Sequence, residues 1–294
     1  MKVAVIGADG QLGRDVVAAF VEAGSPVTEL THADIEISSW ESVRGALERL
    51  QPDLVVNTAA FHHVDKCESD PAKAFAVNGI GARNLAQTTA SLEAILAHIS
   101  TDYVFDGNKG SPYSERDCAI PLNVYGNTKL SGESFVQTLN PRHFVLRVAG
   151  LYGSNPCRAK GGLNFVELML KMSKERDELR VVDDEFTTPT PTKEVARQLV
   201  ALSRTTEYGL YHATCEGGCS WYEFASAIFY LTGTTVRLER ARPGEFPAKV
   251  PRPKYSVLEN EALKNRSLNV FRHWKEGLRD YLHHRNQANV PASA

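Results

Sequence analysis

Apolar runs and amphipathic stretches alternate through the first half of the chain. Nearly continuous apolar runs predict buried strands at residues 2–7, 26–30, 53–60, 94–101 and 143–153. Between them, apolar residues recur at helical spacing and predict helices at residues 12–24, 38–52, 70–92 and 125–139. Strands that alternate with helices indicate βαβ units, so we expect an α/β protein with a Rossmann-type, doubly wound parallel sheet.

The pattern changes after residue 150. Helices are expected at residues 163–177 and 193–205, and residues 205–260 mix short elements with proline-rich turns. We therefore predict a first domain over residues 1–150 and a mainly substrate-binding lobe over residues 151–294. Elements near residues 187–204 are expected to return to the first domain.

Composition and charge narrow the class of protein. The chain has 294 residues and is 43% hydrophobic, enough for a large core, and its formal net charge of -2 offers no basic field for nucleic acid or an anionic membrane. The sequence has no run of 18 uncharged residues, and it therefore indicates neither a signal peptide nor a membrane span. We expect a cytoplasmic protein. The five cysteines do not indicate a disulfide framework, and Cys215 and Cys219 lack the second ligand pair of a zinc site.

A glycine-rich turn joins the first predicted strand to the first helix. In "GADGQLG", Gly7 permits a tight turn, Gly10 lets the backbone approach a pyrophosphate, and Gly13 lets helix and strand pack closely. The GxxGxxG spacing in a βαβ context predicts a dinucleotide site, so the first domain is expected to bind NAD(P).

The residue that reads the adenosine ribose is expected after the second strand, in "TELTHADIEIS". Glu29 could accept a hydrogen bond from a ribose hydroxyl, His32 could instead face a 2′-phosphate, and Glu36 lies a few residues further on. Each of them could equally lie in a solvated loop, so the choice between NADH and NADPH stays open.

A hydroxyl, a phenol and an ammonium follow in an informative order. Thr101 ends the fourth strand, where a parallel sheet presents side chains to a ligand, and Tyr125 and Lys129 follow on the next helix. Four residues apart, the last two share one helix face. An ammonium beside a phenol favours the phenolate, so Lys129 is expected to lower the pKa of Tyr125. The order predicts that Tyr125 exchanges a proton with a substrate oxygen, assisted by Lys129 and Thr101.

The chain resembles the extended short-chain dehydrogenase/reductases and, more closely, the dTDP-4-dehydrorhamnose reductase family. The stretches that carry the resemblance include "GADGQLG", "STDYVFDG", "PLNVYGNTKLSGE" and "VVDDEFTTPT", in the same order along the chain. It implies that NADPH or NADH reduces the C4 ketone of dTDP-4-dehydro-L-rhamnose, with Tyr125 as proton donor.

The resemblance also implies binding residues. On the cofactor side these are Gly7, Gly10, Gln11, Leu12, Gly13, His32, Glu36, Ile37, Ala59, Ala60, Phe61, His62, Tyr125 and Lys129. On the substrate side they are Thr101, Asp102, Tyr125, Gly150, Arg252 and Ser256. Ile37 and Ala60 could instead be core residues.

Three departures from the family pattern bear on these expectations. Gly150 stands where many members carry tryptophan, which predicts extra room beside the sugar. Glu36 replaces the usual aspartate. Some members bind magnesium at a dimer interface; Asp15 fits one ligand position, but Lys193 would repel the metal, so magnesium is not expected. A monomer and a homodimer both stay open.

Two rival functions remain. A nucleotide-sugar epimerase or dehydratase would recycle bound NAD, although such relatives are longer and "STDYVF" has no glutamate after its aspartate. A regulatory relative, such as a subunit of methionine adenosyltransferase, would keep the fold without the chemistry. Consumption of NAD(P)H by the isolated protein would separate these readings.

Overall fold

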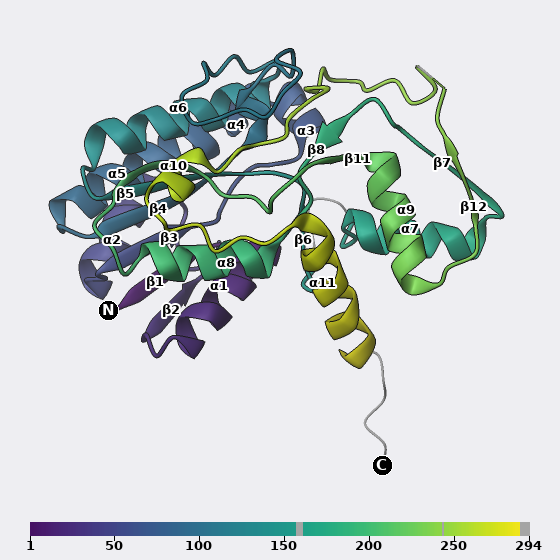
Figure 1. Ribbon diagram of the computed structural model, residues 1–294. Coiled ribbons are helices and arrows are strands. Elements are labelled where there is room, and N and C mark those ends of the chain that lie inside the picture. The colour runs from purple at the N-terminus through teal and green to yellow at the C-terminus, as the bar shows by residue number, and fades with distance from the viewer. Residues whose placement is uncertain (157–160, 243, 289–294) are drawn as a thin grey trace.

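The computed structural model describes residues 1–156, 161–242 and 244–288, and its centre is a six-stranded sheet (Figure 1). The strand order is β10-β5-β4-β3-β1-β2, and every pairing is parallel. The predicted α/β fold with a Rossmann-type parallel sheet is confirmed. The strands are β1 Val3–Ile6, β2 Val27–Leu30, β3 Leu54–Asn57, β4 Ile95–Thr101, β5 His143–Val148 and β10 Gly209–His212.

Helices cover both faces of this sheet, which explains why the central strands are apolar throughout. Helices α1 (Gln11–Glu22) and α8 (Thr192–Leu202) pack together on one face. Helices α2 (Trp40–Leu50), α5 (Gly81–Ser91) and α6 (Val124–Leu139) cover the other. The chain leaves β1 toward β2 on one side, and β3 lies on the other side of β1. This reversal creates the crevice position at which such sheets bind ligands.

The segment predicted as one helix over residues 70–92 is interrupted. It consists of α4 (Pro71–Phe75), a π-helical turn (Ala76–Ile80) and α5. Single π turns inside helices often occur at functional sites, because the extra residue redirects a side chain. Here the turn contains the buried Asn78.

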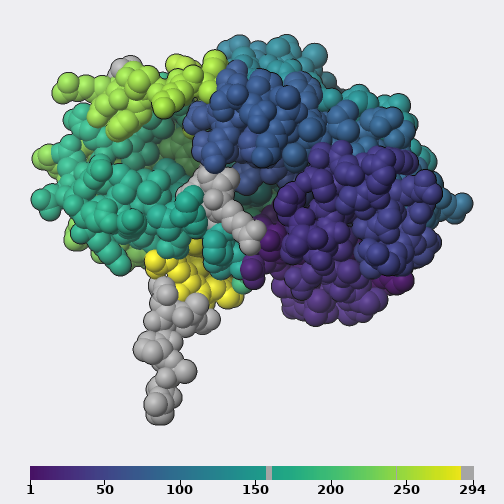
Figure 2. All heavy atoms as spheres, turned by 180° about the vertical axis from the view of Figure 1, so that it is seen from behind, coloured from purple at the N-terminus to yellow at the C-terminus, as the bar shows by residue number. Residues whose placement is uncertain are grey.

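Residues after 150 build a second, smaller group of elements. These are β6 Leu151–Tyr152, α7 Phe165–Glu175, β7 Glu178–Val181, β8 Phe186–Thr187, β9 Thr190–Pro191, β11 Cys219–Ser220, α9 Trp221–Thr232, β12 Arg237–Arg240 and α11 Trp274–Ala288. Helices α7 and α9 pack through Phe165, whose ring stacks on Phe224 with centroids 5.4 Å apart. From behind, these later residues lie beside the first helices and strands (Figure 2).

Three elements of the second half nevertheless pack with the main sheet. Helix α8 packs on α1, β10 is the edge strand beside β5, and α10 (Glu261–Asn265) packs on β10. The boundary at residue 150 and the assignment of residues 151–294 to a substrate lobe stay predictions, and residues 157–160 and 289–294 lie outside the described residues.

The described part of the chain has no helix that is both long and apolar enough to cross a bilayer. Its cysteines, Cys67, Cys118, Cys215 and Cys219, are free thiols, and Cys157 lies outside the described residues.

Candidate active site

The glycine-rich turn has the backbone that its spacing predicts. Gly7 has φ of 75°, and a Cβ built on it would lie 2.9 Å from Thr58 Oγ1. A Cβ on Gly13 would lie 2.1 Å from the carbonyl oxygen of Gly7, so only glycine lets α1 approach the turn this closely. Among the described residues no side chain caps α1 at Gly10, which leaves the first backbone N–H groups of the helix free for an anion.

Two further residues of this turn point in different directions. Leu12 is buried in the core, whereas the Gln11 side chain reaches across to the later part of the chain and donates to the carbonyl oxygen of Asn155 at 2.9 Å. Only the backbone of Leu12 is therefore available to a ligand.

The loop after β3 carries four predicted cofactor residues, Ala59, Ala60, Phe61 and His62. The amide of Asn78 holds this loop at Phe61. Its Oδ1 accepts from the Phe61 N–H at 2.8 Å, and its Nδ2 donates to the Phe61 carbonyl at 2.9 Å. The π-helical turn thus fixes the loop that follows the strand.

The predicted ribose-reading residues lie after β2. His32 and Glu36 are 3.4 Å apart (Nδ1 to Oε2), and Glu36 also accepts from Ser38. Ile37 is a core residue, as one of the two alternatives had it, because its side chain is buried against Gly81. Only its backbone can face a ligand.

Tyr125 lies in the first turn of α6, beside the end of β4. The helix begins because the Asn123 side chain accepts from the Gly126 N–H. The Tyr125 ring meets Tyr103 edge to face, with centroids 5.8 Å apart. Burial raises the pKa of Tyr125 well above its usual value, and a hydrogen bond with Thr101 partly opposes this. The expected lowering of this pKa is therefore wrong for the protein without ligand.

The side chain of Lys129 is bound to strand β4. Its buried Nζ donates to the carbonyl oxygen of Ile99 at 2.6 Å and lies 3.4 Å from Nε2 of His98. Burial lowers the pKa of Lys129 to about 8, with Glu133 acting in the opposite direction. The ammonium is thus bound to β4, and the main causes that shift the pKa of Tyr125 are burial, the Thr101 hydroxyl and the groups Asp102, Cys67 and Tyr103.

Three of the predicted substrate-binding residues contact one another near Tyr125. Asp102 accepts from Thr101 Oγ1 at 3.0 Å and from Ser256 Oγ at 2.6 Å, and all three are buried. Arg252 comes from the same late segment as Ser256, and its charge acts on Tyr103 and Glu185. Residues from the two halves of the chain therefore meet at the carboxyl end of β4.

Gly150 has a structural requirement of its own. Its φ is 54°, and a Cβ built on it would lie 2.8 Å from the carbonyl oxygen of Thr188. A side chain at this position would meet the backbone of residues 188–189, and the expected extra room beside the sugar stays a prediction.

Several buried polar residues escaped the sequence analysis. Glu133 forms a buried ion pair with Arg147 at 2.7 Å and accepts from Ser100 Oγ at 2.5 Å. Asn57 and His98 form a second buried pair, with Nδ2 and Nδ1 3.1 Å apart. The only signal in the sequence is a polar residue inside an apolar strand or on the buried face of a helix.

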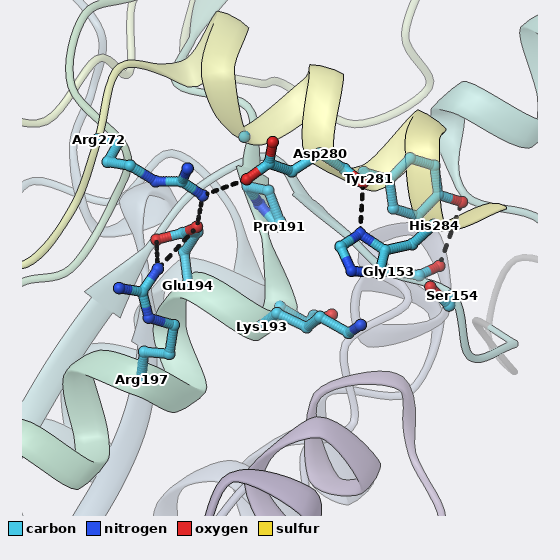
Figure 3. Close-up of a pocket in the computed structure, with 12 residues that line it drawn as sticks. Gly153, Ser154, Pro191, Lys193, Glu194, Arg197, Arg272, Asp280, Tyr281 and His284 are labelled. Carbon is cyan, nitrogen blue, oxygen red and sulfur yellow. Dashed lines mark hydrogen bonds and ion pairs between the residues drawn. The ribbon is translucent and has the colours of Figure 1, made fainter. Parts of the chain in front are cut away.

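A separate cavity of about 180 Å³ lies between α8, α11 and the loop after β6 (Figure 3). Several of its charged side chains are paired: Arg272 binds Glu194 at 2.5 Å and Asp280 at 2.7 Å. None of the predicted catalytic or binding residues lines it. It is therefore distinct from the site at Tyr125.

The residues considered for magnesium lie near this cavity. Asp15 is buried and accepts from Thr192 Oγ1, and burial raises its pKa against the opposing effects of that bond and of Lys193. In the described ranges no three His, Cys, Asp or Glu side chains gather as metal ligands. The expectation about magnesium stays a prediction.

Sequence comparison gives nearly full-length matches. The family model described as "RmlD substrate binding domain" matches residues 1–287. "Spore coat polysaccharide biosynthesis protein SpsK" of Bacillus subtilis is 41% identical over 287 residues, which cover 98% of this chain and 99% of the relative. The "dTDP-4-keto-6-deoxy-D-glucose reductase" of Streptomyces niveus is 38% identical over 276 residues, which cover 93% and 94%.

Comparison with solved structures agrees. A dTDP-4-dehydrorhamnose reductase from Clostridium acetobutylicum has a TM-score of 0.93 and 40% identity, covering 97% of this chain and 100% of that chain. A dTDP-4-dehydrorhamnose reductase from Bacillus anthracis, solved in complex with NADP, has a TM-score of 0.91 and 33% identity, covering 96% and 99%.

Proposed function

The chain belongs to the RmlD substrate-binding domain family, and from this premise we propose that it reduces a nucleotide-linked 4-keto sugar with NADPH or NADH. The proposed reaction is reduction of the C4 ketone of dTDP-4-dehydro-L-rhamnose to dTDP-L-rhamnose. Relatives with reductase names and one relative in complex with NADP support an NAD(P)H-dependent oxidoreductase.

The observation that carries the proposal is the convergence at the end of β4. The Thr101 hydroxyl acts on the Tyr125 phenol and donates its hydrogen to Asp102, which also accepts from Ser256. This arrangement offers two hydroxyls to one substrate oxygen, beside side chains from the late part of the chain that could hold the sugar.

The turn before α1 fits a dinucleotide. The uncapped N–H groups of the helix and the absence of a Cβ at Gly10 leave a cradle for a pyrophosphate. Gly7, Gly10, Gln11 and Gly13 would hold it there, and Phe61, fixed by Asn78, would contact the adenosine side. NAD(P)H, when bound, supplies the hydride.

Tyr125 is the proposed acid. Its raised pKa keeps the phenol protonated at neutral pH, and this is the form that a reduction requires. An alkoxide is a far stronger base than a phenolate, so the proton moves to the substrate oxygen. Thr101 donates to the same oxygen once its hydroxyl turns away from Asp102, and Lys129, in its charged form, stabilises the phenolate that remains.

The test follows the absorbance of the reduced nicotinamide with dTDP-4-dehydrorhamnose generated in place. NADPH and NADH are offered separately to the wild type and to Tyr125→Phe. We expect Tyr125→Phe to fold normally and to lose about 10²- to 10⁴-fold in kcat, the range of general acid catalysis. Tyr103→Phe removes a neighbouring phenol and is expected to lose less than about tenfold.

Other results point elsewhere. A Tyr125→Phe enzyme with near wild-type turnover would remove the proposed acid. Activity only on dTDP-4-keto-6-deoxy-D-glucose would keep the reductase and change the sugar, as the Streptomyces niveus relative suggests. Conversion of a sugar nucleotide without net oxidation of cofactor would indicate an epimerase or a dehydratase. Cofactor binding without any turnover would favour a regulatory protein.

A further inference from the structure

A chain of buried polar side chains runs from the predicted cofactor loop to Lys129. The backbone N–H of Ala59 donates to Oδ1 of Asn57 at 3.1 Å. Nδ2 of Asn57 lies 3.1 Å from Nδ1 of His98, and Nε2 of His98 lies 3.4 Å from Nζ of Lys129. All three side chains are at most 2% exposed, so water does not compete for these contacts.

The first contact fixes the others. The Ala59 N–H needs an acceptor, so the amide of Asn57 must turn its oxygen to Ala59 and its NH₂ group to His98. Nδ1 of His98 then accepts a hydrogen bond and carries no proton. A neutral imidazole has one N–H, which therefore lies on Nε2 and faces Lys129.

An N–H that faces Lys129 favours one of its two charge states. An ammonium has three donors and no acceptor, whereas a neutral amine has a lone pair that can accept from Nε2–H. Nζ of Lys129 also donates a hydrogen bond to the carbonyl oxygen of Ile99. Burial keeps His98 neutral, because its pKa is well below the usual value.

We propose that His98 is a positioning residue for Lys129, held by Asn57 with its proton on Nε2, so that Lys129 stays poised between amine and ammonium. This inference rests on the proposed function for the role of Lys129, but the tautomer itself does not. It also makes the charge of Lys129 depend on the loop at Ala59, which is predicted to contact the cofactor.

The other charged groups around Lys129 do not replace the effect of the His98 N–H on its charge state. On α6, Glu133 lies one turn after Lys129 and favours the ammonium, although Arg147 of β5 and Ser100 of β4 share its carboxylate. Tyr125 lies one turn before Lys129 on the same helix. The groups whose charges act on Tyr125 are Cys67, Asp102 and Tyr103.

The tautomer is measured by long-range ¹H–¹⁵N correlation spectra of the histidine-labelled protein. His98, assigned by the loss of its signals in His98→Gln, should show an unprotonated Nδ1 and a protonated Nε2. His212 is an internal control, because its Nδ1 faces the carbonyl oxygens of Tyr113 and Glu259 and must carry the proton. A protonated Nδ1 on His98 would overturn the proposal, whether or not any variant folds.

The link to Lys129 is measured with Asn57→Asp. A carboxylate still accepts from Ala59 but also accepts from His98, so the proton should move to Nδ1 and Nε2 should accept from the ammonium. The titration of Lys129, followed by its ¹³Cε shift, and the alkaline limb of kcat/KM should both move up by about one pH unit, a tenfold change in proton affinity. Asn84→Asp, at a similarly buried amide that donates to the Ile37 carbonyl oxygen and not to this chain of side chains, should leave both in place.

The outcomes separate cleanly. A switched tautomer with an unchanged Lys129 titration would refute the effect of His98 on Lys129. A shifted ¹³Cε titration in a protein without reductase activity would keep the inference and remove the proposed function. A merely structural role would lower stability or kcat in Asn57→Asp without moving either titration.

Discussion

Replacing Lys129 by methionine tests the energetic cost of the buried ammonium. Burial lowers the pKa of Lys129 from 10.5 to about 8. That difference corresponds to about 3 kcal/mol by which the folded protein disfavours the charged form. The unfolded chain binds the proton more tightly, so between pH 8 and pH 10.5 it carries more protons, and the stability of the wild type should rise with pH. Lys129→Met has no such group.

The assay is urea unfolding of both proteins at pH 7, 8, 9 and 10. The methionine side chain of the variant cannot donate the hydrogen bond to Ile99, which changes stability equally at every pH, so the pH trend is the informative quantity. The free energy of unfolding of the variant minus that of the wild type should fall by about 2 kcal/mol between pH 7 and pH 10.

Two comparisons separate the effect of Lys129 from other effects of pH on stability. The buried Cys215 and Cys219 thiols have raised pKa values and destabilise both proteins at high pH, so their effect cancels in the difference. Lys171→Met, at a lysine whose side chain is 59% exposed, should show no such trend. A difference that stays constant from pH 7 to pH 10 would refute the burial argument.

Two further predictions concern the cofactor turn and the buried ion pair. Gly13→Ala should lose NADPH binding, measured by fluorescence titration, because its Cβ would lie 2.1 Å from the Gly7 carbonyl oxygen. In Gly45→Ala the new Cβ has no atom within 4 Å, so the free energy of unfolding in urea should rise by about 0.5–1 kcal/mol. Full NADPH binding by Gly13→Ala, or a less stable Gly45→Ala, would contradict the packing argument. Glu133→Ala should cost about 3–5 kcal/mol by leaving Arg147 buried and unpaired, and a double variant with Arg147→Leu should recover part of that loss.

The regular part of the fold was predictable from periodicity. Strands β1 to β5 and the first helices lie where apolar runs and amphipathic stretches predict them, because each is buried on both faces or one face. Strand β10 was not assigned, since its four residues lie in the stretch after residue 205, where the sequence mixes short elements. Helix α9 was also missed, because apolar residues occur around most of it and hide the helical periodicity. One of these residues, Tyr230, is 86% exposed, so the apolar positions do not mark the buried face.

The candidate site was likewise only partly predictable from the sequence. Glycine spacing and residue order indicated Gly7, Gly13, Thr101 and Tyr125, because those features are local in the chain. The partners of buried polar groups are remote: Asn57 and His98 are 41 residues apart, and Asp102 and Ser256 are 154 apart. No local pattern gives such pairings, and the direction of the pKa shift of Tyr125 was misjudged because it is set mainly by burial, which depends on the folded chain.

The late return of α8 and β10 to the main sheet has a consequence for synthesis on the ribosome. The first 150 residues contain α1 and β5, but the helix that covers α1 and the strand that pairs with β5 end only at residue 212. At about 5–20 residues per second, the ribosome needs about 3 to 12 s to make the roughly 60 residues between. During that interval the nascent chain presents an uncovered apolar face and an open strand edge. A chaperone that shields exposed apolar surface would be needed earliest at this stage.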